Sequence, residues 1–283
     1  MRLRSLLFVP GDRPERFAKA AASGADALIL DLEDAVAFDR KAAARDAVRE
    51  ALCQGDRKTP LLVRLNPLDS GLIDDDLKAL AGASPDALML PKAEGEASVA
   101  ALDKRLSAHG LAGALLLPIA TETPAAVFAL GSFSKAAARL IGLTWGAEDL
   151  PAAIGATSAR EEDGRFTPPY EVARALTLFA AASAGVSPID TVYPAFRDIE
   201  GLARYAARAA RDGFVGMMAI HPAQVAPINA AFTPSAEALA HAREIVAAFA
   251  ANPGAGALNL GGKMIDFPHL KQARRLLDRA ASV

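Results

Sequence analysis

Residues 5–34 read SLLFVPGDRPERFAKAAASGADALILDLED, and this stretch decides the fold. Two short apolar runs, residues 6–9 and 27–30, stand on either side of an Ala-rich segment. Apolar runs of this length are too short for a helix and are typical of strands buried in a parallel sheet. The stretch therefore predicts a strand, a helix and a second strand.

The same alternation continues along the chain. Further short apolar runs lie at residues 61–64, 87–90, 114–119, 139–143, 189–193 and 216–220, which makes eight runs with the first two. Eight strands alternating with helices are the number that closes a TIM barrel. A doubly wound parallel sheet would alternate in the same way, so the position of the polar residues has to decide between the two.

Polar side chains gather where the apolar runs stop. In a barrel the carboxyl ends of all strands meet on one face, where the active site is built. We therefore predict an α/β fold, a TIM (β/α)8 barrel, with its site at this face. The polar residues concerned are Asp31, Glu33, Asp34, Arg64, Asn66, Lys92, Glu122, Glu148, Asp149 and His221.

The pattern changes after residue 232. A long Ala-rich segment, roughly residues 235–251, predicts one helix, and the Pro and Gly of residues 252–256 predict its end. A closing helix is expected from about residue 267 to 281. The sequence thus predicts a barrel domain over residues 1–232 and a small C-terminal helical extension over residues 233–283.

Composition restricts the functional classes. The net charge is −2 and no long basic run occurs, which argues against a nucleic-acid or anionic-membrane surface. The single Cys53 has no disulfide partner, which favours a reducing compartment. The apolar N-terminus is too short for a signal core, and no apolar run approaches a membrane span. We expect a cytoplasmic protein that acts on a small molecule.

Glu122 and Asp149 follow the fifth and sixth predicted strands and are the candidate metal ligands. Two carboxylates can hold Mg²⁺ and leave positions for water and for a bidentate 2-oxo acid. The chain has four His and no His pair at metal spacing, so zinc is disfavoured. As an alternative, either acidic residue could simply cap the helix that follows its strand.

Arg64 ends an otherwise apolar strand, so its guanidinium must pair with a buried carboxylate or face the barrel mouth. The candidate partners are Glu33 and Asp34. The two interpretations are compatible, because an Arg held by carboxylates can present its other donors to an enolate or carboxylate oxygen.

Three further residues near predicted strand ends are candidates for ligand contact. Arg13 and Lys19 follow the first strand and could meet a phosphorylated ligand, although Lys19 could also belong to a solvated helix face. His221 precedes Pro222, which restricts it to extended geometry and favours a turn residue over a ligand.

Taken together, the segments resemble the citrate lyase beta-subunit-like family, which includes malyl-CoA and citramalyl-CoA lyases. Each motif is weak alone, but ten occur in series over nearly the whole chain. They are SLLFVPGDRP (5–14), DLEDAV (31–36), VRLN (63–66), PK (91–92), TET (121–123), GAEDL (146–150), IDTVY (189–193), IHPAQ (220–224), FTPS (232–235) and GKMID (262–266).

The resemblance implies a role for each matching residue. It implies a magnesium ion on Glu122 and Asp149, with the ion holding the substrate, and a 2-oxo acid or enolate on Arg64, which Glu33 and Asp34 would support. It also implies that Asp266 is the catalytic acid or base, carried by an extension that crosses to a neighbour in a trimer or dimer of trimers. Asp266 could equally cap the final helix. The CoA contacts implied are Phe8, Arg13, Lys19, Ile220 and His221.

The implied reaction is cleavage of a 3-hydroxy-acyl-CoA into acetyl-CoA and a 2-oxo acid. The alternatives are a thioesterase on the same site, a citrate lyase beta subunit that needs an acyl carrier protein, and a barrel without turnover. Two departures from the family pattern bear on the acyl substrate. Residues 123–126 lack the Gly common after the metal-binding Glu, and Met217 stands where many members have Lys.

Overall fold

The computed structural model describes residues 1–281; Ser282 and Val283, the last residues of the predicted extension, lie outside the described residues. Eight parallel strands run in the order β5-β4-β3-β2-β1-β8-β7-β6. They are β1 (Ser5–Pro10), β2 (Ala27–Asp31), β3 (Leu61–Arg64), β4 (Ala87–Leu90), β5 (Leu116–Pro118), β6 (Gly142–Thr144), β7 (Ser187–Asp190) and β8 (Gly216–Ala219).

The sheet nearly closes between β5 and β6. The Ile141 amide donates to the Leu116 carbonyl, and the Ala120 amide donates to the Thr144 carbonyl, each at 2.9 Å. These two bonds join the edge strands, so the sheet curls into a ring. The predicted TIM-barrel architecture is confirmed, and each strand overlaps the apolar run that predicted it.

Helices connect the strands. Four of the connections, those after β1, β2, β5 and β8, contain a 3-10 helix as well as an α-helix. The helices of the barrel are α1 (Phe17–Ala21), α2 (Lys41–Cys53), α3 (Ile73–Leu80), α4 (Gly95–Ala108), α5 (Pro124–Ala129), α6 (Asp149–Ile154), α7 (Pro168–Ala184), α8 (Ile199–Asp212) and α9 (Val225–Ala231). The 3-10 helices are η1 (Pro14–Arg16), η2 (Phe38–Arg40), η3 (Leu130–Arg139) and η4 (Pro222–Gln224).

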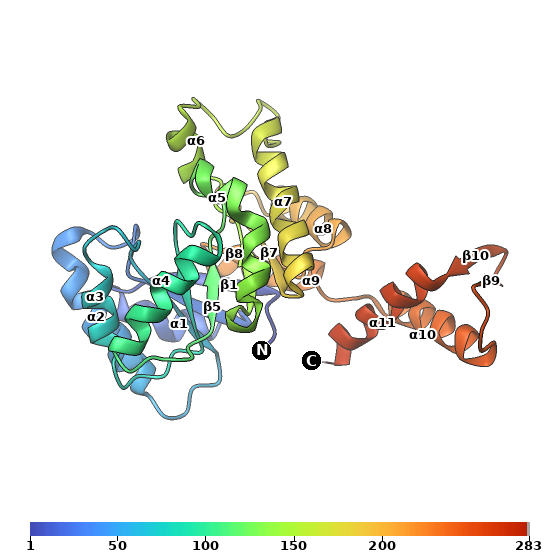
Figure 1. Ribbon diagram of the computed structural model, residues 1–283, viewed down its shortest axis with the longest axis horizontal. Coiled ribbons are helices and arrows are strands. Elements are labelled where there is room, and N and C mark those ends of the chain that lie inside the picture. Colours follow the sequence, from blue (N-terminus) through green and yellow to red (C-terminus); the bar gives the residue numbers. More distant parts are fainter. Residues whose placement is uncertain (282–283) are drawn as a thin grey trace.

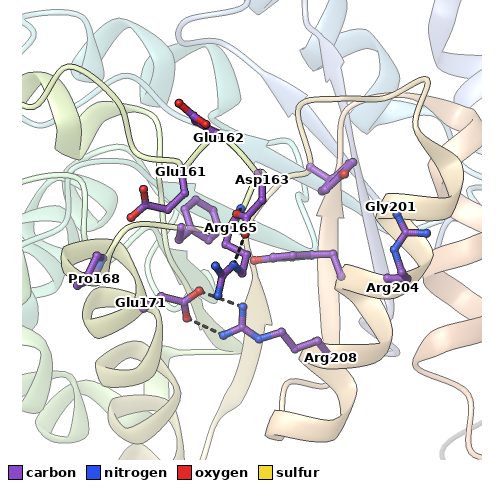
Figure 2. A pocket seen from close by; sticks show the side chains of 13 residues that line it. Glu161, Glu162, Asp163, Arg165, Pro168, Glu171, Gly201, Arg204 and Arg208 are labelled. Carbon is purple, nitrogen blue, oxygen red and sulfur yellow. Dashed lines mark hydrogen bonds and ion pairs between the residues drawn. The ribbon is translucent and has the colours of Figure 1, made fainter.

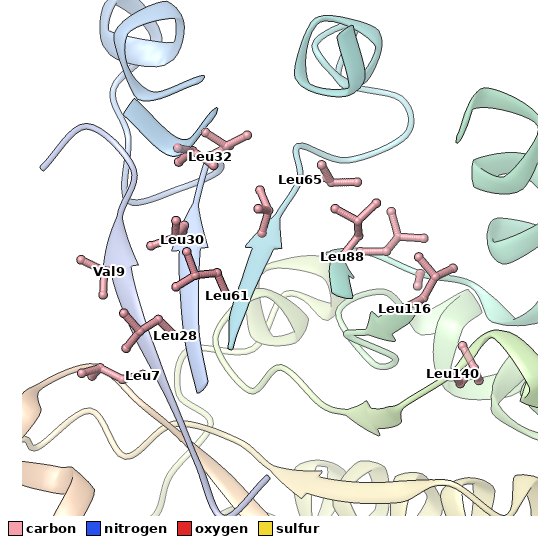
Figure 3. Packing of buried hydrophobic residues seen from close by; sticks show 14 of the residues in the cluster. Leu7, Val9, Leu28, Leu30, Leu32, Leu61, Leu65, Leu88, Leu116 and Leu140 are labelled. Carbon is pink, nitrogen blue, oxygen red and sulfur yellow. The ribbon is translucent and has the colours of Figure 1, made fainter. Parts of the chain in front are cut away.

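The core has two layers because side chains alternate across each strand. Leu7, Leu28 and Leu30 point outward and pack with buried helix residues in one cluster, part of which Figure 3 shows. Leu6 and Ile29 point into the barrel and fill it with other buried residues. Side chains two or four positions further along an inward face reach the mouth, and this is how the strands position the site.

The C-terminal segment stands off one side of the barrel in Figure 1 and consists of α10 (Ala236–Ala251), β9 (Ala257–Leu260), β10 (Lys263–Asp266) and α11 (Phe267–Ala281). Its buried residues, among them Ile245, Phe249 and Leu270, form a cluster drawn only from this segment. Both predicted helices are confirmed.

The sequence predicted a helical extension, but the extension also contains an antiparallel hairpin, formed by β9 and β10. Gly261 (φ 58°) and Gly262 (φ 81°) make its two-residue turn. Both positions need positive φ, which glycine adopts at no steric cost.

Within residues 1–281, no helix has both the length and the apolar character needed to cross a membrane.

Candidate active site

A cavity of about 250 Å³ opens at the carboxyl ends of the strands. The structure therefore brings together residues that are far apart in sequence but were all predicted for one face. Those predicted from sequence and found in its lining are Phe8, Asp34, Arg64, Glu122, Asp149 and Ile220.

Arg64 is fixed by two carboxylates. Its Nε and Nη2 donate to the two oxygens of Asp31 at 2.7 and 2.6 Å, and its Nη1 lies 2.8 Å from Glu33 Oε2. Asp31 and Arg64 are direct neighbours in the β2–β3 register, so the ion pair follows from the strand pairing. The guanidinium also lies over the Phe8 ring, 4.9 Å from its centroid.

Of the two predicted partners of Arg64, Glu33 is confirmed and Asp34 is not. Glu33 does pair with Arg64, but Asp34 is exposed and makes no ion pair with it in the described chain, whereas the buried Asp31 makes the closest contact. Asp31 follows Ile29 on the inward face of β2, while Asp34 lies beyond the strand end. Asp31 thus engages two of the five N–H donors of Arg64 in hydrogen bonds, Glu33 adds an ion pair, and further donors are left for a ligand.

Glu122 and Asp149 lie after β5 and β6 on adjacent sides of the cavity. Neither makes a side-chain cap. Thr123 caps α5 by accepting from the Ala126 amide, and Asp149 is the first residue of α6, where no side-chain cap bond is present. The alternative that these carboxylates serve as helix caps is therefore wrong.

The surroundings of Glu122 disfavour the charged form of its carboxyl group. Burial raises the pKa of its carboxyl group to about 8, and the nearby Asp149 charge adds to this, while the Lys92 amide hydrogen bond opposes it. Gly146 lies so close that a Cβ there would be 2.7 Å from Glu122 Cγ, so glycine leaves the space that this carboxylate occupies. A cation beside Glu122 and Asp149 would relieve the charge.

The donor set fits magnesium better than zinc. Among residues 1–281 no group of three or more His, Cys, Asp or Glu side chains is arranged to hold a metal. Mg²⁺ is commonly held by one or two carboxylates, with waters and substrate oxygens completing six positions. Glu122 and Asp149 are therefore the residues that could hold a magnesium ion here.

Lys92 was predicted to lie at the mouth with the other polar residues that follow strands, but it was given no role there. Its backbone amide donates to Glu122 Oε2 at 2.6 Å. Its ammonium group lies 2.9 Å from Glu33 Oε1 and 3.4 Å from Asp149 Oδ1. One residue therefore contacts both candidate metal ligands and the carboxylate that holds Arg64.

Asp190, at the end of β7, was not predicted as a site residue and supports the β6 side of the mouth. It is fully buried and accepts hydrogen bonds from Trp145 Nε1 at 2.6 Å and from the Arg174 guanidinium at 2.8 and 3.0 Å. The Tyr205 hydroxyl donates to it as well. This network anchors the Trp145 side chain. Because Trp145 begins the segment that leads through Gly146 to Asp149, the network also holds the start of that segment in place.

An adjoining cavity of about 400 Å³ lies between β1, α1 and β8. Four of the five predicted CoA contacts line it, and it shares two of them, Phe8 and Ile220, with the mouth cavity. A long ligand could therefore run from one cavity into the other. The predicted residues in its lining are Phe8, Lys19, Ile220 and His221.

Arg13 is the exception among the predicted CoA contacts. It precedes η1, is exposed, and lies 3.8 Å from Asp12 instead of lining the cavity, whereas Arg16 does line it. His221 has the predicted turn role, since its Nδ1 accepts from the Ala223 amide, and its ring also stacks on Phe196 with 5.1 Å between centroids.

A larger cavity, of about 1040 Å³, lies between the loop before α7 and helix α8 (Figure 2). Two of its guanidinium groups pair with carboxylates: Arg208 forms a bidentate pair with Glu171 at 2.6 and 2.9 Å, and Arg165 pairs with Asp163 at 2.6 Å. The charged residues of this cavity lie largely on exposed loop and helix surface and not at the carboxyl ends of the strands, so its size does not make it the chemical site.

Asp266 does not line the mouth cavity of its own protomer. It ends β10, and the His269 ring, whose Nδ1 lies 2.5 Å from the Asp266 carboxylate, holds the pKa of that carboxyl group below the usual range. Asp266 also stands directly before α11, where a helix cap would lie, so the capping interpretation stays a prediction.

Three comparisons with known proteins agree with this geometry. The HpcH/HpaI aldolase/citrate lyase family matches residues 4–222. A citrate lyase subunit beta-like protein of Mycobacterium tuberculosis is 40% identical over 274 residues, which are 97% of this chain and 94% of that protein. An L-malyl-CoA/beta-methylmalyl-CoA lyase of Cereibacter sphaeroides is 36% identical over 302 residues, covering 99% and 95%.

The fold also matches a solved structure over almost its full length. Protein CitE of Mycobacterium tuberculosis, in complex with magnesium, acetoacetate and coenzyme A, superimposes with a TM-score of 0.83 at 38% identity. The match covers 99% of this chain and 98% of that one.

Proposed function

This chain belongs to the HpcH/HpaI aldolase/citrate lyase family, and we propose that it is a magnesium-dependent carbon–carbon lyase that splits a 3-hydroxy-acyl-CoA into acetyl-CoA and a 2-oxo acid. One observation carries the proposal: Arg64, Glu122 and Asp149 line a single cavity at the barrel mouth. A dication site beside a fixed guanidinium suits a reaction that develops negative charge on an enolate.

The protein's own groups position the substrate. Arg64 is held by Asp31 and Glu33, so its remaining N–H donors point at a fixed place. Magnesium, when bound to Glu122 and Asp149, would supply a Lewis acid that lowers the pKa of the substrate hydroxyl. Cleavage passes the proton of that hydroxyl to the catalytic carboxylate and turns its oxygen into the carbonyl of the 2-oxo acid, while the electron pair of the broken bond becomes the acetyl-CoA enolate. Arg64 counters the enolate charge.

The adjoining cavity is the proposed place of the CoA arm. Lys19 and Arg16 supply positive charge for phosphate groups at its rim, and Phe8 and Ile220 provide apolar surface where it meets the mouth. Both properties match a ligand that is anionic at one end and a thioester at the other. Arg16 replaces Arg13 in this proposal, because Arg16 lines the cavity.

The enolate needs a proton on carbon, and we assign this step to Asp266 of a neighbouring subunit. Within one protomer Asp266 lies in the extension, away from the mouth lining. We propose that residues 233–281 form a separate unit that caps the mouth of another copy in a homo-oligomer, a trimer or a dimer of trimers. Covering the carboxyl group in that way would raise its pKa toward the range of a general acid.

The outer surface of α7 supports an oligomer. Val172, Leu176 and Phe179 recur at helical spacing and are all exposed, although the opposite face of α7 is buried in the barrel. Phe128 of α5 is 93% exposed, and η3, which continues α5, packs against α7. A helix that is apolar on its solvent face as well as its core face is typical of an interface.

Phe179→Asp is expected to shift the protein to a smaller assembly, because a carboxylate would have to be desolvated in the interface. Light scattering after size exclusion measures the mass. Leu115→Asp is the control: Leu115 is exposed and directly precedes β5, at the amino end of the barrel and away from both the α7 surface and the mouth, so its variant should keep the parental mass. An unchanged mass for Phe179→Asp would exclude this face from the assembly.

Arg64→Lys is expected to lower kcat about a hundredfold while the protein stays folded, because lysine keeps the charge but loses the planar fork that Asp31 and Glu33 hold. Steady-state kinetics with the best thioester substrate measures the effect. Full activity in Arg64→Lys would mean that only a positive charge is needed at this position.

A panel of malyl-CoA, citramalyl-CoA and citryl-CoA, each assayed with magnesium, tests the proposed function and identifies the acyl group. A lyase gives acetyl-CoA and a 2-oxo acid in equal amounts. Release of free CoA would favour the alternative thioesterase instead. Turnover only with an acyl-carrier-protein thioester would favour the alternative of a citrate lyase beta subunit.

A further inference from the structure

Lys92 adopts a backbone conformation that lysine rarely takes. Its φ is 51°, and it is the one non-glycine residue of the described chain with a positive φ. A side chain in this left-handed region is strained and persists only where the surroundings hold it in place. At Lys92 the conformation lets the backbone amide reach Glu122 while the side chain turns to Glu33 and Asp149.

The ammonium group of Lys92 stands where several carboxylates converge. It lies 2.9 Å from Glu33 Oε1 and 3.4 Å from Asp149 Oδ1. A lysine amine is protonated at neutral pH unless it is buried without a partner, and these carboxylates supply partners. Lys92 therefore places a positive charge inside the acidic cluster.

We propose that Lys92 is a positioning residue that acts as a built-in counter-cation for the metal ligands, balancing Asp149 and Glu33 until magnesium takes Asp149 over. The proposal rests on the magnesium site of the proposed function and deepens it. Glu33 is buried and also paired with Arg64, so it remains as the partner of Lys92, whereas Asp149 is about one third exposed and can be given up.

Two consequences follow from Coulomb's law at these separations. Without metal, the ammonium group offsets the repulsion among Glu33, Glu122 and Asp149, so its loss should destabilise the metal-free protein. With metal, the same positive charge repels the dication and competes for Asp149. Removing the charge should therefore tighten magnesium binding even though it weakens the metal-free fold.

The experiment compares full-length Lys92→Met with the parent. Thermal unfolding is followed in EDTA and in excess magnesium, and magnesium affinity is measured by calorimetry. Lys92→Met should melt lower than the parent in EDTA, regain most of the loss in magnesium, and bind the ion about tenfold more tightly. Lys92→Arg, which keeps the charge, should behave like the parent in both conditions.

Lys41→Met is the matched control. Lys41 is also a buried amine near Glu33, but it donates to the Leu32 and Glu33 carbonyls and to Asn66 Oδ1 rather than to Glu122 or Asp149. Its variant should lose the same stability with and without magnesium. Lys92→Asn serves if Lys92→Met does not fold, since asparagine tolerates positive φ and also removes the charge.

Equal destabilisation of the neutral Lys92 variants in EDTA and in magnesium, with unchanged affinity, would overturn the inference and leave Lys92 a structural residue. Weaker magnesium binding would overturn it as well, because a counter-cation must compete with the metal. If the parent itself does not bind magnesium, the metal site of the proposed function is wrong and this inference falls with it.

Discussion

Glu122→Gln is expected to lower kcat by about a thousandfold, since the loss of a metal ligand removes several kcal/mol of transition-state stabilisation. Glutamine keeps the size of the side chain and an oxygen that can accept from the Lys92 amide, so the fold should remain. Asp149→Asn should act in the same way. Calorimetric titration with magnesium should show that both variants bind the ion far more weakly than the parent.

Glu161→Gln provides the control for a general effect of charge removal. Glu161 lines the other cavity, between the loop before α7 and α8, and contacts neither Arg64 nor the candidate metal ligands. Its variant should keep parental turnover and magnesium affinity. Parental magnesium binding in both Glu122→Gln and Asp149→Asn would place the metal elsewhere.

Asp266→Asn is expected to lower kcat by about two orders of magnitude or more, the usual contribution of a general acid, without weakening magnesium binding. Asparagine caps a helix about as well as aspartate, so this substitution separates the capping role on α11 from proton transfer. Full activity in Asp266→Asn would mean that Asp266 only caps.

Mixing two inactive variants tests whether Asp266 acts in the neighbour's site. Under subunit exchange, Asp266→Asn chains supply an intact Glu122, and Glu122→Gln chains supply an intact Asp266. Sites that combine an intact Glu122 from one chain with an intact Asp266 from its neighbour should regain activity. No recovery despite proven exchange would place Asp266 in its own protomer's site or outside catalysis.

The barrel could be predicted because its signals are local. Each strand is a short apolar run, and polar residues end the runs on one face, so the sequence alone predicts Arg64, Glu122 and Asp149 at the mouth. The hairpin in the extension also has a local signal, because Gly261-Gly262 is a two-residue turn between short segments, although the longer helical patterns on either side dominate that region.

Three features of the site could not be predicted so directly from the sequence. The choice of Asp31 over Asp34 as the partner of Arg64 depends on the β2–β3 register, which only strand alternation from Ile29 could have suggested. The role of Lys92 depends on its positive φ, and a Pro-Lys-Ala sequence gives no sign of that conformation. Arg16, and not the predicted Arg13, lines the adjoining cavity. The 3-10 helix η1 (Pro14–Arg16) turns the chain here, so Arg16 reaches the cavity while Arg13 lies beside Asp12.

The measurement that tests the central claim most directly is the stoichiometry of products from the best 3-hydroxy-acyl-CoA, taken with magnesium and with EDTA. The account predicts one acetyl-CoA and one 2-oxo acid for each substrate consumed, no net free CoA, and loss of turnover in EDTA. Free CoA without a 2-oxo acid, or the same rate of cleavage in EDTA, would contradict it.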